Sequence, residues 1–228
     1  CYMPSVNRVD GSVWCSGIGA EDNSLMRLEL GSNPPETCIA EVYEAPPSMS
    51  NPPIYGSGGV HIDSSGVAWQ NWRGSGHLAS FDRSKCDLTS GPATGQSCPE
   101  GWTFHRRDNP TFRNASFPIN SDESYLIQVD HHDALGLGRD VPIYGAVNTD
   151  SLEAFLPDSE EFITLRLPYP MGFFSRSTVG RIDDASTGWK GKGLWSNYSN
   201  YVGWHLEGGA GVLQKAIKFQ MRPDPLAK

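Results

Sequence analysis

The chain has 228 residues, and its 25 Gly and 17 Pro make it richer in turn-forming residues than an average protein. Its 11% aromatic share and modest 19% of charged residues exclude a disordered chain. No apolar run approaches the ~20 residues of a membrane span. The net charge of −8, without a run rich in Lys or Arg, argues against a nucleic-acid partner.

Short strand-like runs separated by Gly and Asp-Gly turns predict an all-β chain. The block Val9-Asp-Gly-Ser-Val-Trp14 resembles Ile62-Asp-Ser-Ser-Gly-Val-Ala-Trp69. Each block is followed by two more predicted strands, at Ser24–Leu30 and Ile39–Tyr43 after the first block, and at His77–Asp82 and Trp102–His105 after the second. These two units, about 6–47 and 58–107, therefore have the pattern of a four-stranded meander.

Two looser units follow in the chain. The third, about 125–168, has predicted strands at Tyr125–Val129, Ile143–Asn148, Leu152–Leu156 and Phe162–Leu167. The fourth, about 172–222, has predicted strands at Phe173–Ser177, Gly193–Ser196, Trp204–Glu207 and Ala216–Met221. Radial repetition of such meanders is typical of a β-propeller, and a β-sandwich is the structural alternative. We expect one β-propeller segment of about four four-stranded blades that belongs to a larger ring.

The five cysteines lack the spacing of a zinc or haem site and favour disulfides. Cys86 and Cys98 bracket a polar loop, and closing it would remove roughly 3 kcal/mol of unfolded-chain entropy. Cys15 and Cys38, on neighbouring predicted strands, form the second predicted pair, which leaves Cys1 over. Disulfides indicate an oxidising compartment, so we expect a periplasmic or secreted protein whose export signal has been removed or lies upstream.

Two stretches resemble known sequences. Gly58–Trp69, followed by Gly76–Asp82, resembles the blade repeat of streptogramin lyase-like (virginiamycin B lyase-like) propellers. Motifs from Leu167 onward, among them Gly188-Trp-Lys-Gly-Lys-Gly193 and Lys218–Pro225, are similar to the ends of large exported bacterial proteins that often carry a carboxypeptidase regulatory-like domain. The resemblance implies a propeller fold. The streptogramin lyases use His and Glu with a metal near the central axis, whereas Trp204-His-Leu-Glu207 here has these residue types in reversed order.

The densest cluster of potential metal ligands is Asp130-His131-His132-Asp133. Imidazole and carboxylate groups suit a divalent metal such as Mg²⁺ or Ca²⁺. Neighbouring residues of an extended chain point to opposite faces, so at most two of the four can share one site. A solvated acidic loop is the alternative interpretation.

Two further groups could act in a site. His205 and Glu207 lie two apart on a predicted strand, so both point to one side, where the carboxylate could raise the basicity of the imidazole. A structural hydrogen-bonded pair is the alternative. An aromatic platform for a sugar or another apolar-faced ligand is predicted from the aromatic-rich stretch near the C-terminal end: Trp189, Trp195, Tyr198, Tyr201 and Trp204.

These patterns favour an exported propeller module that binds a ligand or a partner protein. The alternative is a metal-assisted lyase or hydrolase that uses His131, His132, His205 and Glu207. The expected partner is another protein chain or the remaining N-terminal blades of the ring, without nucleic acid and without a membrane span.

Overall fold

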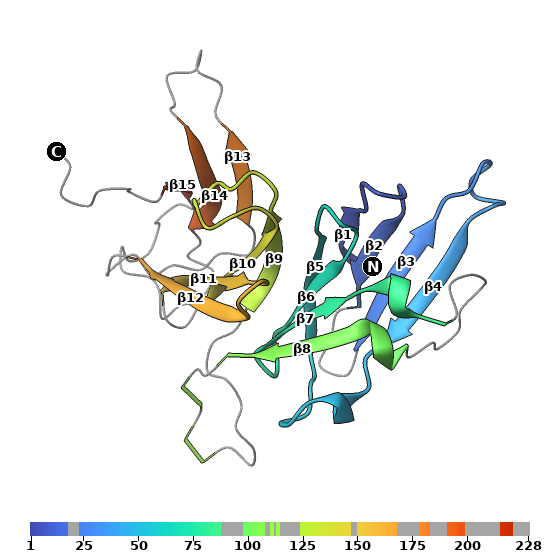
Figure 1. Ribbon diagram of the computed structural model, residues 1–228, viewed down its shortest axis with the longest axis horizontal. Coiled ribbons are helices and arrows are strands. Elements are labelled where there is room, and N and C mark those ends of the chain that lie inside the picture. Colours follow the sequence, from blue (N-terminus) through green and yellow to red (C-terminus); the bar gives the residue numbers. More distant parts are fainter. Residues whose placement is uncertain are drawn as a thin grey trace.

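The computed structural model describes residues 1–17, 23–87, 98–107, 110–111, 113–114, 124–146, 150–167, 178–182, 191–198 and 215–220. Within these ranges the chain is built from antiparallel β-strands and three short 3-10 turns, without an α-helix (Figure 1). The all-β prediction is therefore confirmed. None of the described residues forms a helix long and apolar enough to cross a membrane.

The strands form four sheets, each a meander in chain order. The first sheet contains β1 (Tyr2–Val6), β2 (Val13–Ser16), β3 (Ser24–Glu29) and β4 (Ile39–Glu44). The second contains β5 (Ser57–Ile62), β6 (Ala68–Trp72), β7 (His77–Phe81) and β8 (Trp102–Arg106). The third contains β9 (Ser124–Asp130), β10 (Val141–Ala146), β11 (Ser151–Leu156) and β12 (Glu161–Arg166). The fourth contains β13 (Thr178–Ile182), β14 (Lys192–Tyr198) and β15 (Lys215–Phe219).

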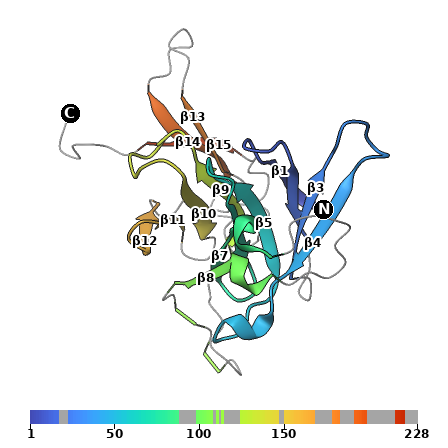
Figure 2. The same ribbon diagram turned by 45° about the vertical axis from the view of Figure 1, so that its right-hand side comes forward.

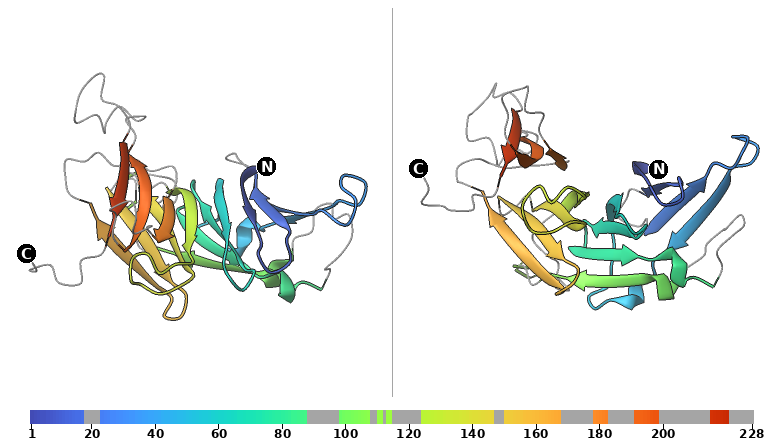
Figure 3. Two further views of the ribbon diagram at one scale, coloured as in Figure 1. Left: turned by 90° about the horizontal axis from the view of Figure 1, so that it is seen from above. Right: turned by 45° about the horizontal axis from the view of Figure 1, so that its top comes forward.

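The first strand of every sheet lies at the inner side of the assembly. β1 contacts β5, β5 contacts β9, and β9 contacts β13. The four sheets follow one another along an open arc, with the first and fourth sheets at its two ends (Figures 2 and 3). This radial stacking of meanders is a β-propeller-like arrangement and not the two facing layers of a β-sandwich.

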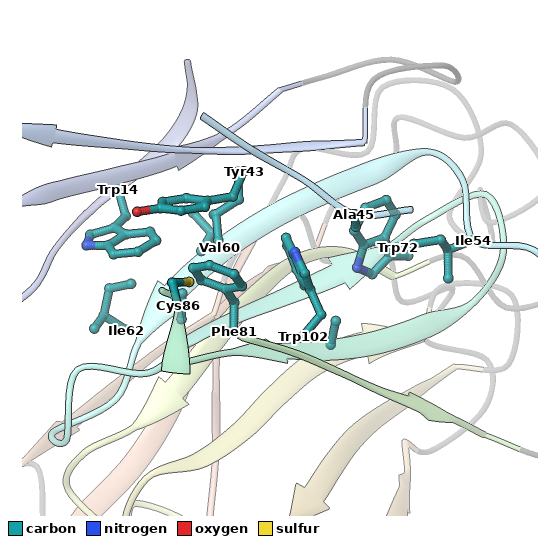
Figure 4. Packing of buried hydrophobic residues seen from close by; sticks show 13 residues of the cluster. Trp14, Tyr43, Ala45, Ile54, Val60, Ile62, Trp72, Phe81, Cys86 and Trp102 are labelled. Atoms are coloured by element: carbon teal, nitrogen blue, oxygen red, sulfur yellow. The ribbon is translucent and has the colours of Figure 1, made fainter. Parts of the chain in front are cut away.

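Large apolar side chains fill the spaces between neighbouring sheets. Between the first and second sheets, Trp14 stacks on Tyr43 with ring centroids 6.2 Å apart, and Tyr43 lies 4.6 Å from Phe81 (Figure 4). Between the second and third sheets, Trp69 packs in one cluster with Ile127 and Phe155. Each repeat tryptophan thus packs against the following sheet. This burial of aromatic surface is the main driving force that holds the arc together.

The first hairpin differs from the one that the sequence repeat indicates. The Asn7 amide donates to the Ser12 carbonyl, just as the Asp63 amide donates to the Val67 carbonyl in the second sheet. The position of Asp63 is therefore taken by Asn7 and not by Asp10, which lies inside the turn. Asp10 binds Arg27 of β3 instead, at 2.9 Å.

One of the two predicted disulfides is confirmed and one is wrong. Cys86 and Cys98 are bonded, whereas Cys15 is bonded to Cys1, and Cys38 is the unbonded cysteine. Cys15 of β2 lies opposite Met26 of β3, and Met26 lies opposite Val42 of β4. Cys38 precedes the far end of β4, two strands and several residues away from Cys15, which is beyond the reach of a disulfide.

Candidate functional site

The turn between β5 and β6 is organised by one carboxylate. Asp63 Oδ1 accepts hydrogen bonds from the amides of Ser65 and Val67, each at 2.9 Å, and from the Ser65 hydroxyl at 2.7 Å. Its second oxygen accepts the indole N–H of Trp69 at 3.0 Å. Such side-chain bonds to nearby amides are why Asp is favoured in tight turns. Asp63 therefore fixes both the turn and the orientation of the Trp69 ring.

The loop between β9 and β10 is organised by Asp130 in a similar way. Its carboxylate accepts the amide of Ala134 at 2.6 Å and that of His132 at 3.1 Å. The fourth sheet lies over this carboxylate: a Cβ added at Gly180 of β13 would lie 3.0 Å from Asp130 Oδ1. The absence of a side chain at Gly180 is what lets β13 approach so closely.

Asp140 joins these two turns. Its carboxylate accepts a hydrogen bond from His131 Nδ1 at 2.8 Å and from the Ser64 amide at 3.1 Å, and the Ser64 hydroxyl donates to it as well. Ser64 belongs to the second sheet's turn and Asp140 to the third sheet's loop. Burial alone would raise the pKa of Asp140, but the hydrogen bonds from Ser64 and His131 outweigh it and lower that pKa. Asp140 is thus an anion that bridges two blades.

A second imidazole lies against this bridge. The rings of His61 on β5 and His131 have centroids 5.3 Å apart. His61 Nδ1 accepts the amide of Val129 at 3.3 Å, so the proton of the neutral ring is on Nε2. Burial, followed by electrostatic repulsion from His131 and Arg8, lowers the pKa of His61 to about 4. His61 is therefore neutral near pH 7, as expected for a half-buried structural histidine.

A cleft of about 430 Å³ opens beside Asp140, between the second and third sheets. We call it the Trp69 cleft. It is lined by residues of the β5–β6 turn, β6, the β9–β10 loop, β10, and the end of β11 with the turn that follows it: Asp63, Ser65, Trp69, Leu137, Gly138, Arg139, Asp140, Val141, Leu156, Pro157, Asp158 and Ser159. The carboxylates of Asp63 and Asp140 are held by the bonds described above, whereas Arg139 and Asp158 are exposed.

Three of the four predicted metal ligands point in different directions. Asp130 points under the fourth sheet, and His131 points toward the second sheet and Asp140. Asp133 accepts the Gly138 amide at 2.9 Å and lies 3.7 Å from Lys192 Nζ. No group of three His, Cys, Asp or Glu side chains in the described part of the chain is arranged to hold a metal ion. The metal assignment for Asp130, His131, His132 and Asp133 stays a prediction.

The other predicted site residues are only partly within the described ranges. His205, Glu207, Trp189, Tyr201 and Trp204 lie outside the described residues, as does the Tyr198 side chain. Trp195 is half-buried on β14, with Lys218 Nζ 6.0 Å from its ring centroid. The catalytic pair and the aromatic platform therefore remain predictions.

Sequence reasoning missed the parts of the site that the fold brings together. Ser64 and Asp140 are 76 residues apart in the chain, and neither carries a local signal of its role. The Asp-Ser-Ser-Gly turn was visible as a repeat element, but its partner in another blade was not. Only the stacking of the second and third sheets creates the Trp69 cleft.

No protein-family model matches the chain, and no curated protein sequence matches it. Solved structures do match it. A streptogramin B lyase structure aligns with a TM-score of 0.52 and 11% identity over 96% of this chain and 54% of that chain. Selenomethionine-substituted virginiamycin B lyase from Staphylococcus aureus aligns with a TM-score of 0.54 and 12% identity, covering 97% of this chain and 55% of that one.

A catalytically inactive variant of the Staphylococcus aureus lyase with quinupristin aligns with a TM-score of 0.52 and 13% identity, over 98% of this chain and 56% of that one. The chain has a streptogramin lyase-like fold. It spans about half the length of these lyases, and at such low identity the likeness concerns the fold alone. In this streptogramin lyase-like arc, the Trp69 cleft lies between two blades.

Proposed function

We propose that this chain is a recognition module that binds a small polar ligand in the Trp69 cleft. The observation that carries the proposal is the cleft itself, whose two walls belong to different sheets and are joined by the Ser64–Asp140 hydrogen bonds. A volume of about 430 Å³ is within the usual range of ligand pockets. Because Asp140 fixes the walls, the cleft is formed before a ligand arrives, which lowers the entropic cost of binding.

The lining favours a ligand rich in hydrogen-bond donors. Three carboxylates lie at the cleft, those of Asp63, Asp140 and Asp158, against the one guanidinium of Arg139. Asp63 and Asp140 already accept hydrogen bonds within the protein, so the exposed Asp158 is the main acceptor offered to a ligand. Carboxylates only accept hydrogen bonds, so hydroxyl and ammonium groups suit them, whereas an anionic ligand is repelled. The ligand class we propose is therefore a neutral polyol or an amine.

Calorimetric titration with maltose, putrescine and citrate tests this function. We expect maltose or putrescine to bind and citrate not to bind. Asp158→Ala, which removes an exposed carboxylate from the cleft, should weaken that binding at least threefold, whereas Glu36→Ala, in an exposed loop of the first sheet, should leave it unchanged. The proposal is wrong if neither solute binds, or if Asp158→Ala and Glu36→Ala have the same effect.

We also propose that the module acts outside the cytoplasm. The disulfides Cys1–Cys15 and Cys86–Cys98 support this location, because such bonds persist in oxidising compartments. Cell fractionation of the protein in its source organism tests it, and recovery of reduced protein from the cytoplasm would contradict it. Nothing in the described part of the site favours the metal-assisted lyase alternative.

A further inference from the structure

One face of the first sheet is apolar and open. Side chains of a strand alternate between the two faces of its sheet. On the face that points away from the second sheet, paired residues form two rows of neighbouring side chains, one across β1 to β4 and one across β2 to β4. We call this the open face of the first sheet. The two rows are Val6, Val13, Leu28 and Ala40, and Cys15, Met26 and Val42.

Neither row of the open face contains a charged residue, and Glu44, which pairs with Ser24, is a charged residue at its margin. The open face lies at one end of the arc (Figure 3). Val6 is 59% exposed, and the other residues of its row are exposed or half-buried. Apart from Cys15, no residue of the open face is buried, and none belongs to a hydrophobic cluster of the described residues. Contiguous apolar surface of this kind marks an interaction site.

The second sheet shows what covers such a face. Val6 pairs with Val13 as Ile62 pairs with Ala68, and in each pair the second residue directly precedes the repeat tryptophan. The row of the second sheet that corresponds to Val6, Val13, Leu28 and Ala40 is therefore Ile62, Ala68, Phe81 and Trp102. All four residues of that row are at most 5% exposed. They pack against Trp14, Leu25 and Tyr43 of the first sheet, which is the preceding blade in the chain.

We infer that the open face of the first sheet is a docking surface for a further four-stranded β-blade, supplied by a polypeptide segment outside these 228 residues. The blade would stack on the first sheet as the first sheet stacks on the second, with aromatic and aliphatic side chains in the positions of Trp14, Leu25 and Tyr43. The lyases of the same fold support this occupant, since the chain aligns with only 54–56% of their length.

The contact between the first and second sheets also argues for a further blade on the open face and against a second copy of the chain that docks through its own open face. Between the first and second sheets, two unlike faces meet: one bears Trp14 and Tyr43, and the other bears Ile62, Ala68 and Phe81. Contacts of this kind are heterologous, whereas two identical open faces would form an isologous pair. The equivalent of the Trp14 face is therefore the expected counterpart.

Photo-crosslinking in the source organism tests the inference. The photoreactive amino acid p-benzoylphenylalanine replaces Leu28 in the polypeptide that carries these residues, and after irradiation the adduct is mapped by peptide mass spectrometry. We expect an adduct with a segment outside residues 1–228 whose sequence shows four short strands of alternating pattern. The same replacement at Thr103, on the outermost strand of the second sheet, is the control and should not capture that segment.

A second measurement uses the unsubstituted protein, so it tests the inference even if the Leu28 variant does not fold. Met26 lies in the open face, so hydroxyl-radical oxidation of Met26 should be at least fivefold slower in the protein in its cells than in the isolated 228-residue chain. An adduct with residues 1–228 of another molecule would overturn the inference in favour of self-association. Equal oxidation rates without an adduct would overturn it by showing that the face is solvated.

Discussion

Glu41 of β4 binds Arg83, which follows β7, with 2.5 Å between Oε1 and Nη2, and this ion pair joins the first sheet to the second. Arg27 contributes a second guanidinium, 3.2 Å from Glu41 Oε2. The Glu41 side chain is only 2% exposed. Burial alone would raise the pKa of Glu41, but the hydrogen bonds from Arg83 and Tyr43 lower it overall. Glu41 is therefore the buried carboxylate shared by both guanidinium groups, and Arg27 also binds the more exposed carboxylates of Asp10 and Glu29.

Glu41→Gln should destabilise the protein by about 3–5 kcal/mol, because it removes the buried counter-ion of Arg83 and one of the three carboxylates that bind Arg27. Urea unfolding followed by tryptophan fluorescence measures the change. Glu44→Gln, at the exposed end of the same strand, is the matched control and should change stability by less than ~0.5 kcal/mol. Equal effects of the two substitutions would show that the network contributes no stability.

Two desolvated histidines, the half-buried His61 and the buried His77, predict a loss of stability in acid. Burial is the main cause that lowers the pKa of both His61 and His77 to about 4, from an ordinary value of 6.5. The unfolded chain therefore binds more protons than the folded one between pH 6.5 and pH 4, so this contribution to stability is complete above pH 6.5 and is lost as the pH falls toward 4.

His77→Gln should reduce the pH dependence. His77 is 2% exposed and accounts for roughly 3 kcal/mol of the difference between pH 7 and pH 4. Unfolding free energies at both pH values measure that difference for the variant and the parent. Titration of the His77 ring signals by NMR is the independent check, and a midpoint near 6.5 in the folded protein would refute the prediction.

Because Ser64 and Asp140 join two blades by hydrogen bonds, substitutions at the two positions should lower the stability of the protein by different amounts. Asp140→Asn removes the charged group that accepts three hydrogen bonds and should lower the free energy of unfolding by about 1–3 kcal/mol. Ser64→Ala keeps the hydrogen bond from the backbone amide of residue 64 and should lower it by about 1 kcal/mol or less. Asp158→Asn, in the exposed wall of the same cleft, should change stability by less than ~0.5 kcal/mol. Thermal unfolding of the three variants would contradict the bridge if Asp158→Asn proved the most costly.

Alkylation distinguishes the five cysteines of the chain. Iodoacetamide should label only Cys38 in the folded, unreduced protein, because the other four are in disulfides. Replacing both Cys86 and Cys98 by Ala should lower stability by about 3 kcal/mol through the larger entropy of the unfolded chain. Peptide mapping checks the pairing, and a Cys15–Cys38 peptide would refute it.

Local patterns in the sequence were sufficient for some features of this fold. The repeated block predicted a Trp-bearing strand in each of the first two units, and both tryptophans, Trp14 and Trp69, pack between sheets. Cys86 and Cys98 lie in one loop, so their pairing needed no knowledge of other strands.

Features that depend on contacts between distant residues could not be predicted in this way. Cys15 pairs with Cys1 because the meander places β1 beside β2. From the sequence, Cys15 was expected to pair with Cys38 because the two lie on neighbouring predicted strands, and no strand was predicted at Tyr2–Val6. Likewise, Asp140 was not considered as a site residue, because its partner Ser64 comes from another blade. β13 was missed because its Val-Gly-Arg-Ile run is interrupted by the glycine that makes room for Asp130.

Among the described strands, the close contacts between sheets join neighbours along the series β1, β5, β9 and β13. Each sheet is therefore stabilised by one or two adjacent sheets and not by a common centre, as in solenoid proteins. Unfolding of such a series should begin at an end and advance sheet by sheet. Partial loss of order in a terminal sheet would then leave the middle of the protein, and the recognition cleft within it, folded and able to act.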